Sequence, residues 1–160
     1  MIGSGIKRGT AELAVVCDRS EVKVWDAATG ALRPLTAEAV PDAGHVLWSP
    51  NGRRLVIRPA DASVDTFTIL DLTKGVLLRY GAQQPLAWSP DGKRIYLSNV
   101  NGSVKVFGVG ADVRVTGLFS IPLPRAGAPR RKEEMPAGLA LSRDGNRLYV
   151  ALNLSNRLAE

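Results

Sequence analysis

Residues able to do metal or nucleophilic chemistry are scarce in this sequence. Cys17 is the only cysteine and His45 the only histidine among 160 residues. A single thiol excludes an intramolecular disulfide and a zinc site built from several thiolates. Cys17 ends an apolar run, which favours a buried and unreactive thiol, and His45 has no other ligand type at metal-binding spacing. The sequence therefore predicts no catalytic residue, no metal ligand and no cofactor.

Three Asx residues recur at one position of a repeated motif, and this recurrence favours a turn role over catalysis or metal binding. Proline presets φ near −65° and glycine accepts a positive φ, so Ser-Pro-Asx-Gly predicts a tight turn in which the Asx side chain bonds its own backbone. The serines of the motif, Ser49, Ser89 and Ser142, are 40 and 53 residues apart. The aligned segments run from Trp48 to Leu55 with Asn51, from Trp88 to Ile95 with Asp91, and from Leu141 to Leu148 with Asp144.

A second motif recurs out of phase with the first. Val22-Lys23-Val24-Trp25-Asp26 and Phe67-Thr68-Ile69-Leu70-Asp71 each precede a turn that ends in glycine, and Val104-Lys105-Val106-Phe107 is a third copy of the strand part. The β-branched and aromatic flanks of both motifs are typical of strands. Each period then holds four strands in about 40 residues, the pattern of a β-propeller blade. Trp48 and Trp88 occupy matching positions, which favours packing between blades over an exposed reader of sugars or peptides.

These segments resemble known propeller repeats. Residues 17–26, with the Trp25-Asp26 dipeptide, resemble the end of a WD repeat; residues 88–96 resemble the WD-like "Pro-Asp" repeats of bacterial propellers. Residues 136–150 are similar to the YVTN and lactonase-like repeats. The resemblance implies an all-β fold, a β-propeller fragment of about three and a half four-stranded antiparallel blades in an incomplete ring. A β-sandwich is the alternative, but it would not repeat the same turns at the same phase. His45 stands too close to Ser49 for the WD histidine network, so we expect it in a loop or at a strand edge.

The repeat register divides the chain. We expect a flexible N-terminus over 1–10 and a partial propeller over 11–160, with blade pieces at 11–40, 41–81, 82–123 and 136–160. No innermost strand is apparent before residue 11, and the last piece ends within its third strand. The expected counts are three, four, four and about two and a half strands. Gly3-Ser4-Gly5 lacks the flanking strand and helix of a phosphate-binding loop, so a flexible terminus is preferred there.

The interval between the second and third turn motifs carries an insertion over 124–135, where the chain passes from one blade to the next. Four cations in it, Arg125, Arg130, Arg131 and Lys132, predict contact with an acidic peptide, a phosphate or a cell-wall polymer. The alternative is a disordered, proline-rich, solvated loop.

The composition bounds the partners. The net charge of +6 comes from both signs spread along the chain, with no basic stripe interleaved with aromatics, so no specific nucleic acid is predicted. No apolar run is long enough to span a membrane, no signal peptide is visible, and the compartment stays unknown.

We expect an interaction or scaffold module, cut from a larger propeller, whose partners are a protein or peptide and either its remaining blades or a second copy. The alternatives are part of a lactonase-like or phosphoesterase-linked propeller enzyme, or of an envelope-associated periplasmic propeller.

Overall fold

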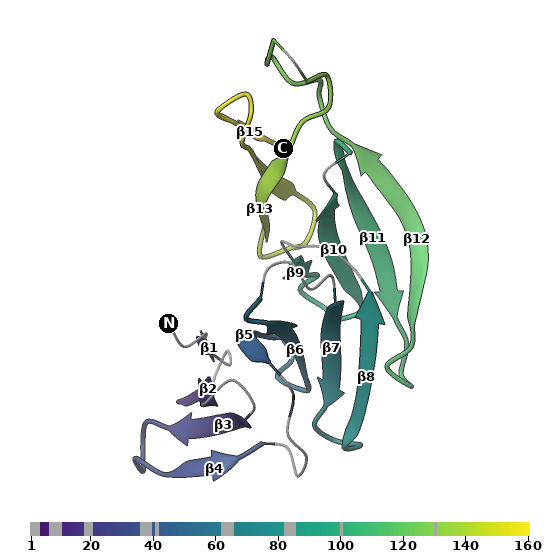
Figure 1. Ribbon diagram of the computed structural model, residues 1–160. Helices are drawn as coiled ribbons and strands as arrows, with labels where there is room; N and C mark the ends of the chain where they lie inside the picture. The colour runs from purple at the N-terminus through teal and green to yellow at the C-terminus, as the bar shows by residue number, and fades with distance from the viewer. Residues whose placement is uncertain are drawn as a thin grey trace. The chain divides into compact units, whose positions relative to one another are not determined.

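The computed structural model describes residues 4–6, 11–17, 21–35, 40, 42–61, 66–81, 86–99, 101–129 and 131–160. Within these ranges the regular structure consists of strands, which form four antiparallel sheets (Figure 1). The chain divides into two compact units, Met1–Ala82 and Gln83–Glu160, each of which holds two sheets. Each sheet corresponds to one of the blades expected from the sequence, and we call it a blade below.

The first unit contains two four-stranded blades whose strands follow chain order. The first blade comprises β1 (Ser4–Ile6), β2 (Glu12–Cys17), β3 (Glu21–Asp26) and β4 (Leu32–Pro34). The second comprises β5 (Ala43–Trp48), β6 (Arg54–Pro59), β7 (Thr66–Asp71) and β8 (Val76–Gly81). Neighbouring strands in sequence are neighbours in the sheet, as in an up-and-down blade.

The expectation of a first blade without its innermost strand is wrong. Ser4, Gly5 and Ile6 pair with Val15, Ala14 and Leu13, and β1 also contacts β5. This strand is held by backbone groups, which every residue except proline can supply in full, so it needs no β-branched or alternating sequence to form. Part of the segment predicted as a flexible terminus is therefore a strand, and Ser4 and Gly5 do not belong to a loop.

The second unit contains one four-stranded and one three-stranded blade. The former comprises β9 (Leu86–Trp88), β10 (Arg94–Asn99), β11 (Ser103–Val109) and β12 (Val115–Pro122), with β12 outermost. Its β11–β12 ladder shifts register between Val106 and Phe107, where Leu118 is the extra residue of a β-bulge. The latter comprises β13 (Pro136–Leu141), β14 (Leu148–Leu152) and β15 (Arg157–Ala159), so the predicted third strand at the end of the chain is confirmed.

The Ser-Pro-Asx-Gly motifs form the predicted turns, and so does the third copy, Ser-Arg-Asp-Gly at residues 142–145. The Ser49 hydroxyl donates to Oδ1 of Asn51 at 2.8 Å and accepts from the Arg54 amide at 2.9 Å, while Gly52 has a φ of 67°. The motifs that contain Asp91 and Asp144 repeat these bonds, and Gly92 and Gly145 also have positive φ. Hydrogen bonds from the serine hydroxyl and from a backbone amide lower the pKa of both aspartates. These side chains hold the turns, as their recurrence predicted.

Apolar side chains form a core within each unit. In the first unit the core joins Ala14, Val22 and Val24 of the first blade to Trp48 and Leu55 of the second. Trp48 is 6% exposed, so its predicted packing between blades is confirmed. Trp88 is equally buried, which excludes an exposed aromatic reader at either position. In the second unit the core contains Ala87, Tyr96, Val104, Val106, Val150 and Leu152.

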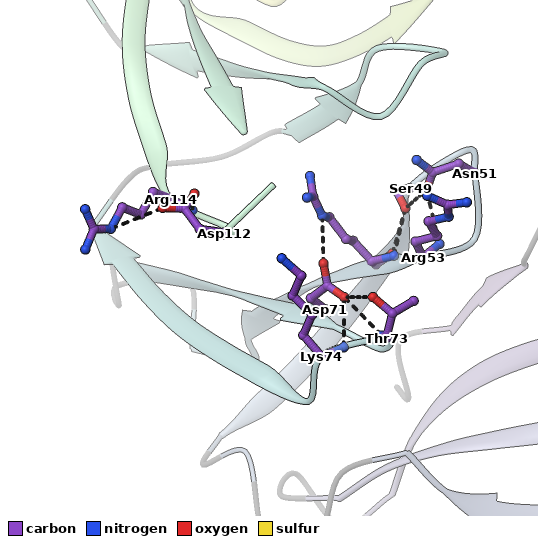
Figure 2. Close-up of polar contacts among 9 residues, drawn as sticks. Ser49, Asn51, Arg53, Asp71, Thr73, Lys74, Asp112 and Arg114 are labelled. Atoms are coloured by element: carbon purple, nitrogen blue, oxygen red, sulfur yellow. Dashed lines mark hydrogen bonds and ion pairs between the residues drawn. The ribbon is translucent and has the colours of Figure 1, made fainter. Parts of the chain in front are cut away.

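Arg54 and Asp71, which are paired at one end of the β6–β7 ladder in the second blade, form an ion pair. Arg54 Nε lies 3.2 Å from Asp71 Oδ2, and the two side chains are 12% and 5% exposed. Asp71 Oδ1 accepts hydrogen bonds from the amides of Thr73 and Lys74 and from the Thr73 hydroxyl (Figure 2). Because the Arg54 amide also donates to Ser49, the turn after β5 and the turn after β7 form one polar network. Burial alone would raise the pKa of Asp71, but the hydrogen bonds outweigh it and lower the pKa.

This network predicts that the free energy of unfolding depends on pH through Asp71, and that Asp71→Asn removes this dependence. We expect the substitution to cost about 1–3 kcal/mol at neutral pH, because Arg54 keeps a buried charge without its partner. The folded pKa of Asp71 lies below the usual value of about 3.9, so its stabilisation is present above that value and is lost as the pH falls through the folded pKa. Chemical denaturation at about pH 7 and about pH 3 should show a smaller cost at the lower pH. The same cost at both values would contradict this role of the carboxylate.

Gly44 allows a close approach that a larger residue would prevent. It lies at the register shift of β5 against β6, between Ala43 and His45. A Cβ built on Gly44 would overlap the Cα and amide nitrogen of Ala60 and would lie 2.8 Å from its Cβ. Since those atoms are backbone or fixed to it, no side-chain rotation can relieve the overlap.

Gly44→Ala is therefore expected to destabilise the chain by about 2 kcal/mol or more, measured as a change in the denaturation midpoint. Gly127→Ala is the matched control, because a Cβ there meets nothing within 4 Å. Equal midpoints for the two variants would show that β5 and β6 accommodate the methyl group.

Candidate functional site

Two connections lie at the same end of the third blade. Successive antiparallel strands reverse direction, so consecutive connections lie at opposite ends of a blade and every second connection lies at the same end. The turn between β10 and β11, at Asn101 and Gly102, therefore shares one end with the insertion that follows β12. The Ser-Pro-Asp-Gly turn between β9 and β10 lies at the other end. The insertion predicted to bind a partner thus lies beside the β10–β11 turn and away from the Ser-Pro-Asp-Gly turn of the same blade.

The insertion has its own hydrogen bonds. The Ala126 amide donates to the Lys132 carbonyl at 2.9 Å, and the Arg131 amide donates to the Ala128 carbonyl at 3.4 Å, which folds the segment back on itself. The Leu123 amide donates to the Gly102 carbonyl at 2.8 Å, so the start of the segment is fixed to the β10–β11 turn. The described part of the insertion is a folded loop, which differs from the disordered linker considered as the alternative.

Glu134 anchors the end of the insertion to the last blade. Its side chain is fully buried. One carboxylate oxygen accepts from the Leu154 amide at 2.7 Å and the Met135 amide at 3.1 Å, and the other accepts from the Ser155 hydroxyl. Leu154 and Ser155 belong to the turn between β14 and β15. Two further bonds reinforce this attachment: the Asn153 amide donates to the Met135 carbonyl, and the Gly127 amide donates to the Ser155 hydroxyl.

These hydrogen bonds keep the anchor ionised. Burial by itself would raise the pKa of Glu134, but the bonds from Ser155, Leu154 and Met135 stabilise the carboxylate and lower its pKa. The carboxylate of Glu134 is thus stabilised by hydrogen-bond donors of the protein itself. This side chain positions the loop, and both of its oxygens are already engaged.

A cavity of about 210 Å³ lies between the β10–β11 turn and the insertion. Arg125 and Lys132 line it and are exposed, and in the described part of the chain their side chains have no hydrogen-bond or ion-pair partner. The exposed Glu133 also lines it without a partner there. The remaining wall includes Asn101, Gly102 and the buried Glu134.

The structure does not bring the four predicted binding residues together as one group. Arg125 and Lys132 lie together at the cavity, whereas Arg131 is half-buried and donates to the Met135 sulfur at 3.2 Å. Arg130 lies outside the described residues. The anchoring role of Glu134 was not predicted from the sequence, because its hydrogen-bond partners follow about 20 residues later and no local sequence pattern indicates them.

The two residues first considered for chemistry lie on strands. His45 is exposed on β5, an edge strand of its sheet, in line with its expected placement. Cys17 is half-buried and not fully buried as expected, because it is the last residue of β2, opposite the exposed Glu21. Among the described residues no three His, Cys, Asp or Glu side chains come together as a metal site would require. The same ranges contain no helix long and apolar enough to cross a membrane.

Solved structures with similar folds include β-propellers. No family model and no curated protein matches the chain. A putative 6-phosphogluconolactonase from Bacteroides uniformis superposes with a TM-score of 0.67 at 17% identity, over 98% of this chain and 49% of that one. The β-propeller domain of Cps50 (Swd1) from Myceliophthora thermophila gives 0.68 at 16% identity, over 94% and 48%. TolB from Acinetobacter baumannii gives 0.63 at 17% identity, over 97% and 38%.

These similarities establish the fold. The chain is an all-β partial propeller of four antiparallel blades with three or four strands each. It spans about half or less of the length of the solved propellers it resembles. At identities below 20% the similarity does not extend to the activities of those proteins.

The anchor predicts how the insertion responds to mutation. Glu134→Ala removes the acceptor of three hydrogen bonds, so we expect trypsin to cleave after Arg125 and Lys132 severalfold faster and the Leu154 amide to exchange faster with solvent. Glu134→Gln should be milder, because its carbonyl oxygen still accepts from the two amides. Glu133→Ala is the matched control, since the exposed Glu133 bonds to nothing in the described chain. Equal cleavage rates in the Glu133 and Glu134 alanine variants would contradict the anchor.

Proposed function

We propose that this partial propeller is a protein-interaction module that binds an acidic segment of a partner through the insertion. The observation that carries the proposal is the pair Arg125 and Lys132, two exposed cations without partners in the described chain, on a loop that Glu134 fixes to the last blade. We also infer that the blades belong to the WD-like and YVTN-type repeats. The recurring Ser-Pro-Asx-Gly turns and the Trp25-Asp26 dipeptide support that assignment.

The physics of association supports a binding role for such a loop. Ordering a mobile segment costs free energy when a partner binds, and a loop that is already held by hydrogen bonds avoids much of that cost. In the second blade, by contrast, the buried Arg54 is paired with Asp71. Arg125 and Lys132 stabilise nothing by pairing within the described chain, so their charge is available to a partner. The net charge of +6 adds long-range attraction for an acidic segment.

The test compares two charge variants in binding to defined peptides. In the loop variant Arg125, Arg130, Arg131 and Lys132 become alanine; in the matched control Arg53, Arg79, Lys93 and Arg143 become alanine. Both variants lose four positive charges. Fluorescence anisotropy with labelled acidic, neutral and basic peptides should show binding of the acidic peptide, weakened about tenfold or more in the loop variant alone. The affinity of the unmodified chain should fall as salt is added.

Two outcomes would contradict the proposal. Equal weakening of peptide binding in both variants would show that only the overall charge matters. Equal peptide binding by the loop variant and the unmodified chain would show that the insertion only connects two blades. Circular dichroism of each variant confirms that the strands are retained.

A further inference from the structure

We propose that the cavity beside the insertion is a specificity pocket that receives one anionic side chain of the bound segment, a carboxylate or a phosphorylated hydroxyl, between Arg125 and Lys132. The inference rests on the proposed binding function and adds to it a single residue that the pocket selects.

The size of the cavity limits what it can hold. Its volume is about 210 Å³. Pockets for drug-sized or cofactor-sized ligands measure about 300–1,000 Å³, whereas a cavity of about 150 Å³ already accepts benzene. The space therefore suits one side chain and is too small for a nucleotide or for several residues of a peptide. A partner that covers the insertion would place one of its side chains here.

The free groups around the cavity determine the charge of that side chain. Glu134 is buried and both of its carboxylate oxygens already accept hydrogen bonds, from Leu154 and Ser155 among others. The exposed charged groups at the cavity are two cations, Arg125 and Lys132, and one anion, Glu133. The sum of these three is one positive charge, which a single anionic group would balance. The carboxylate of Glu133 opposes entry of a second anion.

A neutral donor adds to the pocket. Asn101 uses its side-chain oxygen to accept from the Ser103 hydroxyl at 2.8 Å, which fixes the amide and leaves its NH₂ group without a partner in the described chain. Guanidinium, ammonium and amide groups can together donate to the oxygens of one carboxylate or phosphoryl group. Charge-assisted bonds of this kind are stronger than neutral ones, so an anion is preferred over an uncharged isostere.

The wall of the pocket is closely packed. Gly102 has a φ of 76°, and a Cβ on it would lie 3.3 Å from Glu133 Cβ and 3.4 Å from the Glu134 amide nitrogen. The Leu123 amide bonds to the carbonyl of the same glycine. The β10–β11 turn and the insertion are thus joined by a backbone hydrogen bond at Gly102, and there is little room between this glycine and Glu133.

The experiment titrates the folded chain with single amino-acid derivatives, followed by amide NMR shifts of Gly102, Ala126 and Glu133. The probes are the N-acetyl amides of glutamate, phosphoserine and glutamine. We expect saturable shifts with the two anionic probes, and a response to the glutamine probe at least tenfold weaker. Comparing the two anionic probes decides between a carboxylate and a phosphoryl group. Lys132→Ala and Arg125→Ala should each weaken binding about tenfold, Glu133→Gln should tighten it, and Arg143→Ala, at the opposite end of its blade, should leave it unchanged.

The result that would overturn the pocket differs from the one that would overturn the binding function. Equal shifts with the glutamine probe, or equal losses from Lys132→Ala and Arg143→Ala, would exclude the pocket even if the acidic peptide binds through the insertion. Failure of the peptide itself to bind would overturn the proposed function first.

Discussion

A serine hydroxyl at the start of each repeated turn is the contact on which three of the four described blades depend for their first hairpin. Ser49, Ser89 and Ser142 each donate to an Asx side chain two residues later and accept from the amide five residues later. This pair of bonds fixes the first hairpin of a blade, and therefore the register by which inner apolar residues reach the core. The contact is local in sequence, so it can recur unchanged while the rest of each blade varies.

At the opposite end of the third blade, the described part of the chain forms a connection of a different kind. The loop after β12 takes its shape from contacts made once in the described chain, among them those of Glu134 with the turn between β14 and β15. Repeated local bonds thus hold one end of these blades, and a long-range anchor holds the loop at the other. Arg125 and Lys132 can therefore change without loss of the hairpins that hold the blades.

The sequence predicted what local chemistry dictates. The turns with Asn51, Asp91 and Asp144 follow from residue types within a few positions, and the buried Trp48 follows from its repeat. Three features were beyond it. Ser4–Ile6 pairs through its backbone and carries no strand pattern; Glu134 bonds to residues about 20 positions away; and the separation of Arg131 from Arg125 and Lys132 depends on how the insertion folds back. Each depends on contacts across the chain, which residue types alone do not encode.

The β-bulge at Leu118 has a consequence for how this chain behaves in concentrated solution. β12 is the longest strand and the outermost of its blade, with Leu118 and Phe119 about half exposed. A long, regular, apolar edge of this kind would be a template for another strand and for aggregation. The extra residue interrupts the even spacing of amides and carbonyls along that edge and increases its twist, so a foreign strand cannot pair along its whole length.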